Sequence, residues 1–111
     1  MKIGCHCGAA LSDQADGLPH KAHLIPDQEW FPVFDGLEAV IDEVVAGRTD
    51  AEAAYMKMRS ILGTAARLVY QCQACGRLFV DDRQHQLHTF TPASAETDRA
   101  MLRSRDGDQN A

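Results

Sequence analysis

Two short stretches, Cys5-His6-Cys7-Gly8 and Cys72-Gln73-Ala74-Cys75-Gly76, decide the fold of this 111-residue chain. They hold all four cysteines as two close pairs, and a glycine follows each pair. Two thiolates one turn apart converge on one point, amides inside the turn can donate to the sulfurs, and glycine permits the positive φ that brings the chain back. The sequence therefore predicts one structural metal ion, zinc, bound by Cys5, Cys7, Cys72 and Cys75.

Short strands are expected on both sides of each cysteine turn. Ile3 leads into the first turn and Ala9 to Leu11 lead out of it. Around the second turn, RLVYQ at 67–71 and RLFV at 77–80 combine aromatic and β-branched residues, which is typical of strands. A further strand is expected at 20–25, and another at 87–91 before Pro92.

On these residues the chain resembles the zinc-ribbon and rubredoxin-like group of zinc-knuckle proteins, in a small bacterial type with a long helical insertion. The resemblance rests on Cys5, Cys7 and Gly8, and on Cys72, Cys75 and Gly76 with their flanking strands. It implies that two knuckle hairpins clamp one metal ion. It covers about a third of the chain, and Cys-x-Cys-Gly is a shortened form of the usual knuckle.

Other uses of the four cysteines remain alternatives. Iron suits a four-thiolate shell as zinc does. Two disulfides would require a strained small ring at Cys5 and Cys7 and an oxidising compartment. A thioredoxin-like redox pair at Cys72 and Cys75 needs a helix after the motif, whereas a strand-like segment follows it here.

The residues between the knuckles predict two helices in a hairpin, an insertion at about 27–63. Asp27 is expected to cap the first helix, and Gly47 to end it. Thr49 or Asp50 is expected to cap the second, and Gly63 to end it. Trp30, Phe31, Phe34 and Tyr55 are assigned to the core by default, with an exposed subset as a candidate interface. The apolar stripe of the first helix comprises Trp30, Phe34, Leu37, Ile41 and Val44, widened by Phe31 and Val45.

The fold class predicted is α+β, a small antiparallel zinc-ribbon-like sheet with the inserted hairpin packed beside it. Residues 1–92 are expected to form a single zinc-binding domain. Residues 93–111 are polar and are expected to be a partly disordered tail, with a short helix considered at 96–103.

Charge and hydropathy limit the classes of partner. The formal net charge is −5, which disfavours nucleic acid because an acidic surface repels phosphates. The apolar runs are far shorter than the ~20 residues that span a bilayer. The N-terminus lacks a secretion signal, so we expect a cytoplasmic protein with reduced thiols.

The sequence contains no recognised catalytic motif, so we expect no enzyme. A four-thiolate shell also leaves no open position for substrate. The five histidines are interpreted as solvent-facing or hydrogen-bonded residues rather than a second metal site. They are His6, His20, His23, His85 and His88.

Two function hypotheses follow. The first is a non-enzymatic protein-interaction module with a basic partner, for example a small acidic inhibitor such as a bacterial toxin-neutralising (immunity) protein. The alternative is a nucleic-acid-associated zinc ribbon, in which Arg77, Phe79 and Arg83, with Lys2 nearby, form the contact surface. Metal storage is a third reading. The oligomeric state and the identity of the partner do not follow from the sequence.

Overall fold

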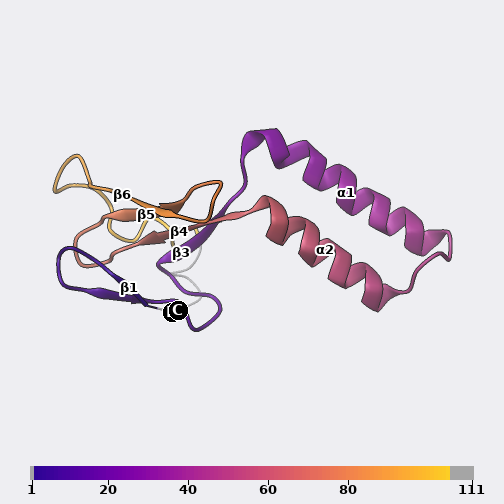
Figure 1. Ribbon diagram of the computed structural model, residues 1–111, viewed down its shortest axis with the longest axis horizontal. Helices are drawn as coiled ribbons and strands as arrows, with labels where there is room; N and C mark the ends of the chain where they lie inside the picture. The colour runs from indigo at the N-terminus through magenta and orange to yellow at the C-terminus, as the bar shows by residue number, and fades with distance from the viewer. Residues whose placement is uncertain (1, 106–111) are drawn as a thin grey trace. The chain divides into compact units, whose positions relative to one another are not determined.

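The computed structural model describes residues 2–105 and shows an α+β fold with two helices and two antiparallel sheets (Figure 1). The segment Leu24–Arg67 forms one compact unit, and the described residues on either side of it form the other. The predicted fold class is confirmed. The two cysteine turns lie on two separate sheets, whereas the sequence suggested a single sheet.

The first sheet is a hairpin of β1 (Lys2–Gly4) and β2 (Ala10–Ser12), with Ile3 opposite Leu11. The second has four strands in the order β3-β4-β5-β6. Its strands are β3 (Lys21–Leu24), β4 (Arg67–Gln71), β5 (Leu78–Asp81) and β6 (Leu87–Phe90). β5 pairs antiparallel with β4 and with β6. The strands predicted from sequence are all present, with ends within two residues of the prediction.

The hydrophobic core of the unit that contains both sheets lies between them. Side chains alternate along a strand, so Ile3 and Leu11 from the hairpin share the core with Tyr70 and Phe79, which face each other on β4 and β5. Cys5 and Cys72 belong to the same buried cluster. The cysteine turns are therefore anchored directly in the hydrophobic core.

A polar network joins the loop after β2 to the four-stranded sheet. The Asp13 carboxylate accepts hydrogen bonds from the Tyr70 hydroxyl at 2.7 Å and from Lys21 Nζ at 2.6 Å. These bonds, the Lys21 bond first, lower the pKa of Asp13. Burial raises the pKa of Tyr70, and the neighbouring Asp13 carboxylate adds to the rise. The network fixes the first hairpin against β4.

The helical unit is a hairpin of α1 (Asp27–Val45) and α2 (Ala51–Ala65), which lie side by side in Figure 1. Gly47, at φ 73°, lies just after the end of α1 as predicted. The expected cap by Asp27 is wrong, because Asp27 is the first helical residue and Pro26 stands at the cap without a side-chain hydrogen bond. At α2 the Asp50 side chain accepts from the Ala53 amide at 2.9 Å, which confirms that cap.

Helix α2 continues past Gly63, where the sequence predicted its end. Gly63 is not in the left-handed conformation that ends a helix. A glycine inside a helix costs about 1 kcal/mol, which the surrounding helix formers offset. The helix ends instead where Ala66 becomes extended, immediately before β4.

The large aromatic residues of the hairpin are exposed, so their assignment to the core is wrong. The seam between the helices is formed by small and β-branched residues, with Val33, Val40 and Ala54 buried. Trp30 and Phe34 form an edge-to-face pair 5.1 Å apart on the surface. A lone helix pair has one narrow seam, and close approach there favours small side chains.

The chain after β6 contains turns rather than the helix considered at 96–103. Arg99 of this segment is hydrogen-bonded to Ala74 of the second cysteine turn, and Asp98 and Met101 are hydrogen-bonded to Gln71 of β4. The predicted disorder of the chain end falls partly on residues 106–111, which lie outside the described residues.

Candidate metal centre

Each cysteine turn is closed by its own backbone. In the first turn the Cys5 amide donates to Ala9 O at 2.8 Å, and the Gly8 amide donates to Cys5 O at 3.0 Å. Gly8 has φ 98°, a left-handed conformation that other residues adopt at a cost. The tight turn brings Cys5 and Cys7 toward the same point.

The second turn repeats this pattern with one more residue. The Cys72 amide donates to Arg77 O at 2.9 Å, and the Gly76 amide donates to Cys72 O at 2.7 Å. Gly76 has φ 86°. In both turns, therefore, the amide of the first cysteine donates to the carbonyl of the residue after the glycine. The glycine amide donates back to the carbonyl of the first cysteine. The shortened turn is a true equivalent of the longer one.

The two turns bring all four predicted sulfurs together. Cys5 Sγ lies 3.5 Å from Cys75 Sγ, and Cys7 Sγ lies 3.6 Å from Cys72 Sγ. All four Sγ atoms lie within 4.8 Å of one another. Sulfurs about 2.3 Å from a central zinc ion in a tetrahedron are about 3.8 Å apart, whereas a disulfide needs about 2.05 Å. The spacing fits four thiolates around one metal ion, and the cysteines are free thiols.

The surroundings shift the pKa values of the two thiols of the second turn in opposite directions. The Arg77 amide lowers the pKa of Cys75 to about 6, and the Arg77 guanidinium donates to Cys75 Sγ at 3.4 Å. Burial raises the pKa of Cys72 to about 11, against the effect of the Cys75 and Ala74 amides. A buried thiol that resists ionisation alone becomes a thiolate when a cation binds it. The second turn thus supplies the amide and guanidinium donors that stabilise a thiolate at Cys75.

The sulfurs differ in their access to solvent. Cys5 and Cys72 are buried, Cys75 is half-buried and Cys7 is exposed. The first cysteine of each turn therefore anchors the site in the core, while the second lies toward the surface.

The second turn is held by Gln71, a residue that sequence reasoning missed. Its side chain is fully buried; Nε2 donates to Asp98 O at 2.9 Å, and Oε1 accepts from the Met101 amide at 3.0 Å. Arg99 Nη1 donates to Ala74 O at 2.8 Å. The chain after Pro92 thus packs on the cysteine turn. The available signal was a polar residue next to a ligand cysteine, directly after the buried residues Val69 and Tyr70.

The histidines take no part in this centre. His20 Nε2 bonds Ser12 O at 2.7 Å, and His88 Nε2 bonds Asp82 Oδ2 at 2.8 Å. Over residues 2–105, the four cysteines are the one group of three or more metal-ligating side chains that meet.

The nucleic-acid surface considered from sequence is not assembled. Phe79 is 4% exposed and belongs to the core, so it offers no ring for a base to stack on. Arg77 is engaged by Cys75. The expectation of an exposed aromatic flanked by arginines was wrong because Phe79 points into the space between the sheets.

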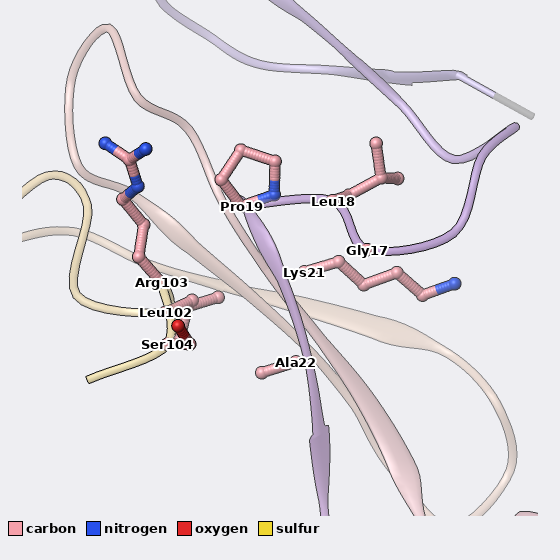
Figure 2. Close-up of a pocket in the computed structure, with 8 residues that line it drawn as sticks. All are labelled: Gly17, Leu18, Pro19, Lys21, Ala22, Leu102, Arg103 and Ser104. Atoms are coloured by element: carbon pink, nitrogen blue, oxygen red, sulfur yellow. The ribbon is translucent and has the colours of Figure 1, made fainter. Parts of the chain in front are cut away.

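A surface pocket of about 480 Å³ is lined by residues of two segments, 17–22 and 102–104. Figure 2 shows that its two cationic side chains, Lys21 and Arg103, point in different directions. Lys21 also forms an ion pair with Asp13. Because the two charges do not converge, the pocket lacks the features of an anion site.

The helices of the described part of the chain are too short or too polar to cross a bilayer. A family described as "Domain of unknown function (DUF8617)" matches residues 1–96. Comparison with curated proteins and with solved structures gave no match.

Proposed function

The chain belongs to that family, DUF8617, whose description states no activity, and we propose that it is a non-enzymatic module built on one structural zinc ion, whose folded surface binds another protein. The convergence of four cysteine sulfurs within 4.8 Å carries the proposal. Four protein ligands complete a tetrahedral shell and leave no position for substrate or water, which supports a structural role over a catalytic one.

The proposed role of the metal is to join two hairpins that are far apart in the sequence. Cys5 and Cys7 belong to the two-stranded sheet, and Cys72 and Cys75 belong to the four-stranded sheet. Zinc supplies fixed tetrahedral bonds between these sheets without redox chemistry of its own. A reducing, cytoplasmic setting would keep the thiols available.

The metal is tested on the full chain purified without chelator. We expect one zinc per chain by elemental analysis, and its loss in Cys72→Ser. Gln73→Ser is the matched control, because Gln73 is exposed in the same turn and should leave the metal content unchanged. One iron per chain, with absorbance in the visible range, would identify the bound metal as iron instead of zinc. Parent protein without any metal and with four titratable thiols would contradict the proposal.

Charge supports a basic protein as the partner. The formal net charge is −5, and residues 27–45 contain six acidic residues and no lysine or arginine. Opposite charge accelerates association and selects partners. A toxin-neutralising inhibitor of a basic protein is one form of this proposal, supported by the small size and acidity of the chain.

The partner proposal is tested on the full chain isolated from its host with whatever proteins accompany it. Asp35→Asn combined with Asp42→Asn should reduce retention of a basic companion at low salt, and the difference from the parent should shrink as added salt screens the charges. Asp16→Asn, in an exposed loop, serves as the control. If every accompanying protein stays bound to the double variant as it does to the parent, the electrostatic partner is ruled out.

A further inference from the structure

One broad face of the α1–α2 hairpin carries large apolar side chains in solvent. Trp30 is 46% exposed, Ile41 52% and Tyr55 59%. We call this set the apolar face; it comprises Trp30, Phe34, Ile41, Val45, Tyr55 and Leu62. Contiguous apolar patches beyond a few hundred Å² are uncommon on monomers and mark contact sites.

Contacts within the hairpin define how the two helices face each other. Val33 and Val40 are buried on α1, and Gly36 lies against Ile61, whose Cδ1 is 3.2 Å from the position of a Cβ at Gly36. Since residues advance by about 100° around a helix, Phe34 and Ile41 lie about a quarter turn from this seam.

The salt bridge between Glu43 and Lys57, 2.8 Å long, shows which residues share a face. Glu43 lies about a quarter turn from the seam of α1, on the side opposite Phe34. Lys57 lies on the side of the α2 seam opposite Tyr55 and Leu62. Because Glu43 and Lys57 meet, the apolar residues of both helices must share the other broad face.

We propose that this face binds a second copy of the same chain, giving a two-fold four-helix bundle in which α1 packs against α2 of the partner. The charges select this arrangement. Helix α1 has six acidic residues and no basic one, whereas α2 carries Lys57 and Arg59 with Glu52. Packing α1 on its own copy would oppose like charges, and packing it on α2 places opposite charges together.

The register within one hairpin extends this charge complementarity to a specific pair. The contacts of Gly36 with Ile61 and of Glu43 with Lys57 place Glu38 level with Arg59. Both residues border the apolar face on its outer edges. With the two-fold axis parallel to the helices, Glu38 therefore faces the partner's Arg59, and symmetry repeats the pair.

The apolar side chains also interleave in this arrangement. The same register places the partner's Leu62 at a height between Phe34 and Ile41. It places the partner's Tyr55 between Ile41 and Val45. Side chains that alternate in height along two facing helices fill the spaces between one another, as in four-helix bundles.

The size of the surface is adequate for a homodimer. Partly exposed aromatic residues present a large part of the ~150–250 Å² that such side chains can bury. Together with Ile41, Val45 and Leu62 they supply several hundred Å² of apolar surface, the larger part of the ~800 Å² per partner in a standard interface. Asp35 and Asp42 stay outside, available to the basic partner proposed above.

Sedimentation equilibrium of the full chain over two decades of concentration tests the proposal. We expect a reversible dimer, with Ile41→Asp weakening dimerisation more than about tenfold. Ile41 is half-exposed in one chain, so the helix should persist by circular dichroism. Glu43→Gln, on the opposite face, is the control and should leave the dimer intact.

Charge reversal tests the pairing of α1 with α2. Glu38→Arg and Arg59→Glu should each weaken the dimer severalfold, and the double variant should restore it, because both symmetric pairs are re-formed. The arrangement would be overturned if the single variants weaken the dimer and the double variant does not restore it. A dimer that is insensitive to Ile41→Asp would overturn it as well.

A monomer at every concentration would overturn the proposal altogether. If Ile41→Asp in such a monomer released exchange protection in the strands, the face would be covered by the chain itself. If Ile41→Asp instead abolished the retention of a basic companion protein, the apolar face would be assigned to that protein. The apolar face contains no cysteine, and the cysteines belong to the other compact unit, so this test and that of the metal site can fail separately.

Discussion

Gln71 is a fully buried amide, and both ends of its side chain are used. Its nitrogen and oxygen bond the backbone of Asp98 and Met101. A buried polar group without a partner costs about 1–3 kcal/mol, so a residue like this fixes the segments that it bonds. Strand β4 thereby holds the chain that returns over the second cysteine turn.

We expect Gln71→Leu to lower the free energy of unfolding by about 1–3 kcal/mol, because it leaves the Met101 amide and the Asp98 carbonyl without partners. Urea unfolding of the metal-loaded chain measures this change. Gln73→Leu is the control, since the exposed Gln73 side chain should change stability by less than about 0.5 kcal/mol. Equal stability of the two variants would contradict the role of Gln71.

Asp13 predicts a dependence of stability on pH. Its pKa is lowered from an ordinary value of 3.8, so the folded state favours the carboxylate. This contribution is present above pH 4 and is lost as the pH falls through and below that value. Asp13→Asn should lower the free energy of unfolding by about 1–3 kcal/mol at neutral pH, through weaker bonds to Lys21 and Tyr70.

The difference between Asp13→Asn and the parent should narrow below about pH 4, where the parent carboxyl becomes protonated. Urea unfolding of the parent and of Asp13→Asn at a series of pH values measures this difference. Asp16→Asn, an exposed residue in the same loop, is the control. A constant difference across the acid range would mean that the carboxylate charge does not matter.

At the scale of elements, the two cysteine turns can be compared directly. Both glycines have positive φ, but their surroundings differ. A Cβ at Gly8 would meet nothing within 4 Å, whereas a Cβ at Gly76 would lie 3.1 Å from Pro92 Cγ. The first turn is open, and the second is covered by the chain after β6.

Alanine at these glycines should therefore have unequal effects. Gly8→Ala should cost about 1–2 kcal/mol, the ordinary cost of a left-handed residue, and Gly76→Ala should cost more because Pro92 must also move. Chelator-induced metal release should accelerate in the same order. If Gly8→Ala is the more damaging variant, the packing of Pro92 on the second turn is unimportant.

Local signals predicted the elements well. Strand β4 has the predicted ends, because aromatic and β-branched residues and the cysteine turn delimit it. The cysteine spacing also identified the four sulfurs that meet. The exposure of Trp30 and Phe34 was not predictable, because periodicity gives an apolar stripe but not what covers it. The contacts of Gln71 join residues 27 and 30 positions apart, beyond any local pattern.

For the whole molecule, two compact units should respond differently to loss of metal. The cysteines belong to the unit outside Leu24–Arg67, and α1 and α2 form the other. Structural zinc contributes about 10 kcal/mol or more in small domains, as much as a typical domain's total stability.

We expect a chelator to abolish hydrogen-exchange protection in β1, β2, β4 and β5, while amides of α1 and α2 keep most of theirs. Exchange measured by mass spectrometry on the full chain, with and without EDTA, separates the two units. The matched control is Cys72→Ser, which should give the EDTA pattern without EDTA. Equal loss in both units would show that they unfold as one.

The distance between the cysteine pairs along the chain also sets an order of events during synthesis. Residues 8–71 lie between Cys7 and Cys72, so a growing chain presents two thiolates long before it can complete the shell. The helical hairpin forms from local contacts and can fold in that interval, which shortens the loop that the second pair must close. We therefore expect metal capture to be a late step, and a ribosome-stalled chain ending at Gln71 should hold no tightly bound zinc.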